Sequence, residues 1–156
     1  MVASAGGRLA YVKPHGALYN EMAVNALVAT TVIEAIRTID SGLIIMGLAG
    51  SHVAQIAADA NMAFVAEAFA DRRYEADGKL RSRLKENAVI SRPEEAARQV
   101  VDITLKNQTK TLEGEPVQIQ AQSFCIHGDN PAAIAILTSI TEQLATAGIE
   151  KKAFAL

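Results

Sequence analysis

The sequence predicts an α/β fold in which a parallel sheet is covered by helices. Two observations predict it. Short apolar runs typical of buried strands alternate along the chain with apolar residues spaced three and four apart, the spacing of one helix face. Polar clusters follow three of the apolar runs, at the positions where parallel sheets bind ligands. Strand and helix alternate four times, and connections of this kind give parallel strands, so we expect a single domain over residues 1–156.

The strands are expected in four apolar stretches. They are residues 9–13, 43–46 and 62–66, and a part of residues 117–126. The first of these stretches is a short strand, and the second, LIIM, is the clearest example of a buried strand. The fourth contains Cys125 between two apolar residues, where it is expected to act as a small buried hydrophobe.

The helices are expected at residues 24–39, 51–60, 91–105 and 130–148. Ser51 is a plausible N-cap of the second, and residues 91–94 read as a capping box with Pro93 in the first turn. Asn130 precedes Pro131 as the cap of the last helix, and Gly148 ends it. Residues 70–88 and 108–116 are predicted to be long loops, which in a compact domain are usually functional.

The composition excludes several classes of protein. Half of the 156 residues are hydrophobic, at 50%, and the net charge is −2, so the chain is not of the disordered class. No basic excess exists to bind nucleic acid, because 15 Lys and Arg face 17 Asp and Glu. The longest apolar run is far shorter than the ~20 residues of a membrane span. A single cysteine and no signal-peptide pattern lead us to expect a cytoplasmic protein without a disulfide framework.

The first polar cluster is Lys13-Pro14-His15-Gly16, directly after the first expected strand. Pro14 cannot continue the strand, so Lys13 and His15 are expected at the rim of the sheet. A cation beside a titratable base suits a carboxylate or phosphate substrate. The alternative is a plain strand terminator with two solvated side chains.

The second cluster follows the third expected strand and contains Asp71, Arg72, Tyr74 and Arg81. Arginine binds carboxylate and phosphoryl groups through two parallel hydrogen bonds. The alternative is a solvated charge run, since residues 77–78 form an Asp-Gly turn signal. A weaker candidate is the segment with Gly47, Gly50 and Ser51, whose exposed amides would bind a phosphate unless the segment is only a tight turn.

The third cluster, around His127 and Asp129, is the strongest signal. His127 ends an apolar strand, and Asp129 follows it by two residues. With Asn130 expected as the helix cap, Asp129 remains available to orient the imidazole as an acid–base or ligand pair. The alternative is a core histidine whose ring is satisfied by the fold.

Four segments together resemble one protein family. They are YVKPHGALYN at 11–20, GLAGS at 47–51, FADRRYEADGKL at 69–80 and QSFCIHGDNP at 122–131. In this order they resemble the LamB/YcsF family over nearly the whole chain. The resemblance implies a parallel, TIM-like β/α barrel similar to polysaccharide deacetylases. Family members have a longer N-terminal section and a whole barrel of this kind has ~250 residues, so we expect the C-terminal part of a barrel that lacks its first strands.

One departure from the family pattern lies in residues 70–88. The family usually has Pro-Gly before Ala-x-Ile, and this chain has Glu86-Asn87 there. Since asparagine tolerates positive φ, we expect the turn to be kept.

The resemblance also implies an activity. It is 5-oxoprolinase activity, the hydrolysis of 5-oxo-L-proline (pyroglutamate) to L-glutamate with ATP, accompanied by Mg²⁺. The resemblance further implies a complex with two other subunits, B and C, and a homo-oligomer is also possible. The family motif positions expected at the barrel mouth are Lys13, His15, Asp71, Arg72, Tyr74, His127 and Asp129.

A mechanism can be assigned to these residues as a hypothesis. Lys13 and Arg72 would offset the phosphoryl charge, and Arg72 or Arg81 would bind the substrate carboxylate. His127, oriented by Asp129, would be the base for water, with His15 as the alternative.

Two other functions stay open from the sequence. The first is a metal-dependent amide or N-acetyl hydrolase, with His15, His127 and Asp129 as the metal ligands. The second is a non-catalytic interaction module or truncated remnant, because a short sheet would leave a parallel edge uncovered.

Overall fold

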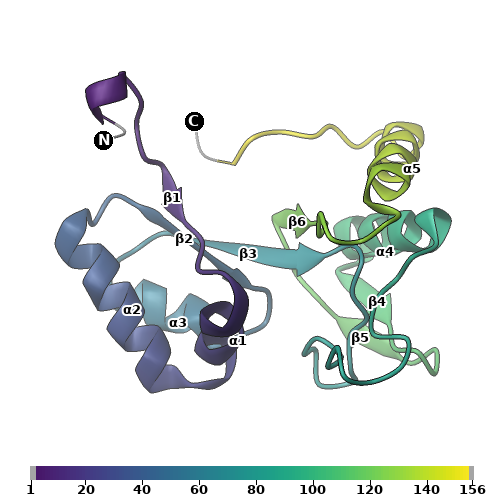
Figure 1. Ribbon diagram of the computed structural model, residues 1–156, viewed down its shortest axis with the longest axis horizontal. Coiled ribbons are helices and arrows are strands. Elements are labelled where there is room, and N and C mark those ends of the chain that lie inside the picture. Colours follow the sequence, from purple (N-terminus) through teal and green to yellow (C-terminus); the bar gives the residue numbers. More distant parts are fainter. Residues whose placement is uncertain (1–2, 155–156) are drawn as a thin grey trace. The chain divides into compact units, whose positions relative to one another are not determined.

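The computed structural model describes residues 3–154, which divide into two compact units (Figure 1). The first unit runs to Glu67 and includes the segment from Ala153, and the second is Ala68–Lys152. A short 3₁₀ turn, η1 (Ala3–Ala5), precedes the first strand. The expectation of one domain over the whole chain stays a prediction.

The first unit is built on parallel strands. They are β1 (Tyr11–Val12), β2 (Ile44–Leu48) and β3 (Phe64–Phe69), which pair in this order. Helices α1 (Gly16–Val24), α2 (Ala26–Ile39) and α3 (Val53–Asp59) connect them. In Figure 1, α2 and α3 lie on the same side of β1 and β2. A core of Met22, Ile33, Ile45, Val53 and their neighbours fills the space between strands and helices.

The helix predicted at residues 24–39 is α2, which begins two residues later, and a separate helix, α1, precedes it. Asn25 has an extended backbone, with φ −123°, and its side chain accepts hydrogen bonds from the backbone N–H groups of Leu27 and Val28. It therefore caps α2 and separates it from α1, because asparagine is among the strongest N-cap residues. Helix α1 was not predicted since it buries only Tyr19 and Met22 and so has no apolar stripe.

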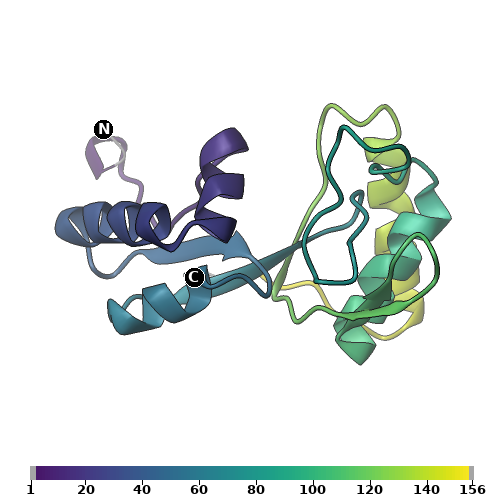
Figure 2. The same ribbon diagram turned by 90° about the horizontal axis from the view of Figure 1, so that it is seen from below.

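The second unit packs two long helices together. They are α4 (Pro93–Lys106) and α5 (Ala133–Thr146), which lie side by side in Figure 2. Their core includes Ile90, Val100, Ile136 and Ile140. Strand β6 (Ser123–Cys125) follows β3 in the sheet order β1-β2-β3-β6, and just beyond the end of β3 the backbone N–H of Ala70 donates to the Cys125 carbonyl at 2.9 Å.

Residues 108–116 are not a loop throughout, as the sequence predicted. Strands β4 (Gln108–Lys110) and β5 (Pro116–Gln118) form an antiparallel pair. Each strand has three residues and buries only its middle side chain, so neither carries enough apolar residues to signal a strand in the sequence. The fourth predicted stretch accordingly contributes to both β5 and β6.

Three predicted helix caps are wrong. The residue that caps α4 is Arg92, which makes no side-chain cap hydrogen bond, so Ser91 is not part of a capping box, although Pro93 does open the helix. Ser51 donates its hydroxyl to the Leu48 carbonyl instead of capping α3. Asn130 accepts from the Ala132 N–H in the turn before α5, and the helix begins at Ala133.

The predicted α/β class with parallel strands is confirmed. The incomplete β/α barrel and the likeness to deacetylases stay predictions. Within residues 3–154, no single helix is long and apolar enough to cross a membrane; the pair α1 and α2, bent by 118°, passes that test by length and composition alone.

Candidate acid–base site

Asp71 and His127 form the centre of the candidate site. Asp71 lies two residues after β3, and His127 lies two residues after β6, so the neighbouring strands bring them together. The Asp71 carboxylate is fully buried; Oδ1 lies 2.9 Å from His127 Nδ1, and Oδ2 accepts from the His127 backbone N–H at 3.0 Å. An ionised carboxylate only accepts hydrogen bonds, so we assign the ring proton to Nδ1 and the lone pair of a base to Nε2.

Two further contacts fix this pair. The Asn130 amide donates to Asp71 Oδ2 at 3.4 Å and to the Ile90 carbonyl at 3.1 Å. The His127 ring stacks on Phe69, with ring centroids 5.2 Å apart and planes inclined by 15°. The His127 side chain is 25% exposed, so a substrate can reach an imidazole whose orientation the fold has already set.

The predicted pairing of His127 with Asp129 is wrong. Asp129 forms an ion pair with Arg83, at 3.1 Å between Nη1 and Oδ2, and both side chains are well exposed. The hydrogen bond from Arg83 holds the pKa of Asp129 below its usual value. The orienting carboxylate is therefore Asp71, which the sequence placed in a different cluster. The adjacency of β3 and β6 in the sheet is the signal that would have joined them.

Arg72 and Arg81 have different environments. Arg72 is buried, donates from Nη2 to the Arg81 carbonyl at 2.6 Å, and its Nε has no hydrogen-bond partner among the described residues. Burial lowers the pKa of Arg72 below its usual value, and the positive charge of Arg83 lowers it further. Arg81 is occupied within its own loop, donating to the Glu86 carbonyl and pairing with Glu75 at 3.2 Å.

Tyr74 contributes to the fold of this loop. It is buried, and its hydroxyl accepts from the Phe69 N–H at 2.8 Å, which ties the loop to the end of β3. The predicted positive φ of Asn87 is confirmed, at 56°. The loop at residues 70–88 is therefore a compact segment that supports the Asp71 backbone.

Gln99 is a positioning residue that sequence reasoning missed. From α4 its amide donates to the carbonyls of Phe69, at 2.8 Å, and Arg72, at 2.9 Å, on both sides of Asp71. Its own oxygen accepts from the Thr109 hydroxyl. A signal was present, because Gln99 is a polar residue among the apolar positions that form the buried face of α4.

In the first unit, Lys13 pairs with Glu67. Their closest atoms are 2.5 Å apart, and the Glu67 side chain is only 3% exposed. Glu67 Oε2 is buried and has no hydrogen-bond partner within residues 3–154. The Lys13 charge, predicted to face a phosphoryl group, is thus already balanced by Glu67, the first residue of the second polar cluster, to which the sequence analysis gave no role. His15 is exposed at the start of α1 and caps it without a side-chain hydrogen bond.

The segment with Gly47, Gly50 and Ser51 forms a tight turn, and phosphate binding by it stays a prediction. A Cβ at Gly47 would lie 3.0 Å from the Phe64 ring, so this glycine permits close packing. Gly50 has φ +75°, which the turn requires. The helix that follows, α3, has seven residues.

No group of three or more His, Cys, Asp and Glu side chains arranged to hold a metal ion occurs in the described part of the chain.

The fold and the site place the chain in the class of α/β proteins that carry an acid–base pair, here Asp71 and His127, at the carboxyl ends of two neighbouring strands, β3 and β6. The LamB/YcsF family model matches residues 1–156, and the chain belongs to that family.

Similar proteins include the A subunit of 5-oxoprolinase from Tolumonas auensis, 42% identical over 96% of this chain and 60% of the relative. The corresponding 5-oxoprolinase chain from Acinetobacter baylyi is 43% identical, over 97% of this chain and 59% of the relative. Among solved structures, the lactam utilization protein from Thermus thermophilus matches with a TM-score of 0.88 and 34% identity, covering 98% of this chain and 61% of that protein. The chain therefore spans about 60% of the length of these relatives.

Proposed function

We propose that this chain acts within the A subunit of a 5-oxoprolinase, which hydrolyses 5-oxo-L-proline to L-glutamate with ATP and Mg²⁺ in a complex with subunits B and C. The observation that carries the proposal is the Asp71–His127 pair, a prearranged base in a chain whose relatives are named as 5-oxoprolinase A subunits. The name lactam utilization protein, given to the solved relative, agrees with a cyclic amide as substrate.

The chemistry needs activation because a lactam carbonyl is a poor electrophile. In the proposed reaction the lactam oxygen attacks the γ-phosphorus of ATP, ADP leaves, and a phosphorylated imidate forms. Water then adds to the ring carbon while His127 Nε2 takes its proton. The C–N bond breaks as the nitrogen accepts that proton, and a second water converts the resulting acyl phosphate to glutamate and phosphate.

Asp71 and Arg72 support this sequence in different ways. The carboxylate of Asp71 stabilises the imidazolium that forms when His127 takes the proton. Arg72, whose Nε has no partner in the described part of the chain, supplies positive charge for the anionic groups of the substrates. Lys13 is assigned no phosphoryl contact, because Glu67 already pairs with it.

The test is glutamate release from 5-oxoproline and ATP by this chain mixed with subunits B and C. A complete A subunit from the source of B and C serves as the positive control. We expect glutamate and phosphate in equal amounts, and none without ATP. Glutamate release without ATP would contradict the proposed activation step. No release while the control is active would show that this chain does not carry the activity.

A further inference from the structure

We propose that Arg83 and Arg72 bind an oxyanion of the substrate, a carboxylate or a phosphoryl group, beside His127, and that Asp129 holds Arg83 in place until that anion binds. This inference rests on the proposed function for the identity of the anion. It assigns a binding role to Arg83, a residue that the sequence analysis did not select.

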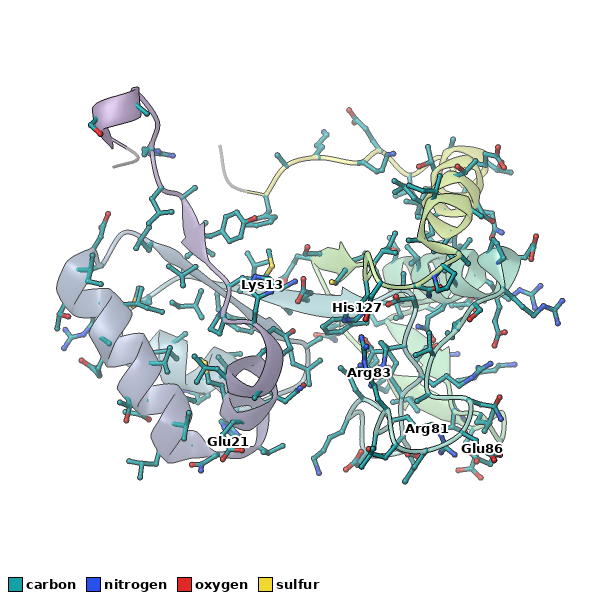
Figure 3. All side chains as sticks on the ribbon, in the orientation of Figure 1. Lys13, Glu21, Arg81, Arg83, Glu86 and His127 are labelled. Carbon is teal, nitrogen blue, oxygen red and sulfur yellow. The ribbon has the colours of Figure 1, made fainter. Side chains whose placement is uncertain are left out.

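Arg83 lies at the acid–base pair although it is distant in sequence. Its guanidinium reaches Asp129, a residue 46 positions later and two beyond His127. Figure 3 draws Arg83 beneath His127, in agreement with this hydrogen bond. The loop at residues 70–88 thus carries a positive charge to the short segment that follows His127.

The Arg72 guanidinium contacts the same loop close to Arg83, since its Nη2 donates to the carbonyl of Arg81, two residues earlier, at 2.6 Å. In agreement with this placement, the charge of Arg83 adds to burial in lowering the pKa of Arg72. Asp71 is occupied by His127 and Asn130, and the Arg72 Nε is left without an acceptor within residues 3–154. An oxyanion bound by both guanidinium groups would offset their positive charges, and arginine recognises carboxylates and phosphates through such hydrogen bonds.

Arg83 is also the guanidinium that is free to change partners. Its ion pair with Asp129 is exposed, with side-chain exposures of 48% and 68%, and exposed ion pairs contribute little to stability. Arg81 differs, because the Glu86 carbonyl and Glu75 both hold it within the loop. An incoming anion therefore competes with one solvated carboxylate for Arg83.

The experiment measures anion binding to the full 156-residue chain by NMR titration, following the His127 ring signals. One arm uses inorganic phosphate and the other uses 5-oxoproline, which separates a phosphoryl site from a carboxylate site. Arg83→Gln should raise the dissociation constant about tenfold, the loss expected for a charge-assisted hydrogen bond. Asp129→Asn should tighten binding, by about threefold, because it removes the competing carboxylate.

Lys85→Gln is the matched control. Lys85 lies in the same loop and pairs with Glu75 on the surface, so its replacement removes the same charge away from the site. Equal weakening by Lys85→Gln and Arg83→Gln would overturn the proposal in favour of a general charge effect. Weakening by Asp129→Asn would also overturn it, since the ion pair would then be structural. Absence of binding in both arms would do the same.

The two proposals fail separately. Binding that depends on Arg83, without glutamate release, would refute the proposed function and retain the anion site. The opposite outcome is also possible to distinguish. If Arg83→Gln still releases glutamate, with unchanged KM values for 5-oxoproline and for ATP, the anion site is refuted and the function is retained.

Discussion

Replacing Asp71 with asparagine tests whether its carboxylate sets the protonation of His127. Asparagine has nearly the same shape, but it keeps one acceptor oxygen and gains an NH₂ group. The native carboxylate faces three donors: His127 Nδ1 at 2.9 Å, the His127 N–H at 3.0 Å and the Asn130 amide at 3.4 Å. In Asp71→Asn, the oxygen can keep the backbone N–H and the Asn130 amide, so the new NH₂ group faces the imidazole.

The size of the effect follows from this exchange. To accept from the new NH₂ group, Nδ1 must lose its proton, and the proton moves to Nε2, where the base is needed. We expect kcat to fall by about 10²–10⁴, the contribution of a positioned general base. The buried site also loses a charge-assisted hydrogen bond, which lowers the free energy of unfolding by about 2–3 kcal/mol.

The assays are glutamate release with subunits B and C, chemical denaturation, and ¹⁵N NMR of the His127 ring to identify its tautomer. Asp102→Asn is the activity control, because Asp102 pairs with Lys106 on the outer surface of α4. Asp129→Asn should leave the His127 tautomer unchanged. A kcat for Asp71→Asn within about threefold of the native value, with the proton still on Nδ1, would refute the assignment of Asp71 as the orienting carboxylate.

Three further predictions concern the supports of the site and the fold. Gln99→Leu removes the donor from two carbonyls beside the end of β3, and denaturation should show a loss of about 2–4 kcal/mol; a loss under ~1 kcal/mol would contradict its positioning role. Gly47→Ala places a Cβ 3.0 Å from the Phe64 ring, so it should lower the free energy of unfolding by about 1–3 kcal/mol. Gly128→Ala, with open space around its Cβ, should leave the free energy of unfolding nearly unchanged. Arg83→Gln should raise the pKa of Asp129 in a ¹³C NMR titration. Because the depressed pKa stabilises the fold above the unfolded pKa and that contribution is lost as pH falls, the variant should lose less stability on acidification.

Apolar patterning was enough to predict the main elements of the fold. The buried run in β2 and the apolar stripes of α4 and α5 are strong local signals, and the structure contains all three. The break at Asn25 and the pair β4 and β5 were missed for a common reason. Both depend on the hydrogen bonds of single polar side chains or short backbone pairs, and these leave no apolar period in the sequence.

The candidate site was predicted only in part. His127 was selected correctly as a residue held by a carboxylate, because it ends an apolar strand next to polar residues. Its partner was misassigned because nearness in sequence favoured Asp129, whereas Asp71 is 56 positions away. Such a pairing becomes visible only when the order of strands in the sheet is known, and sequence periodicity does not give that order.

The two ends of the Asn130 amide limit what this position can hold. In the turn before α5 the Asn130 oxygen accepts from the Ala132 N–H, and an aspartate oxygen could accept this hydrogen bond as well, so local structure alone would accept either residue. The amide nitrogen, however, lies 3.4 Å from Asp71 Oδ2. Aspartate would set a second buried carboxylate there, and one of the two would have to take up a proton. The choice of residue at position 130 is therefore made by the charge of a side chain 59 positions earlier in the chain.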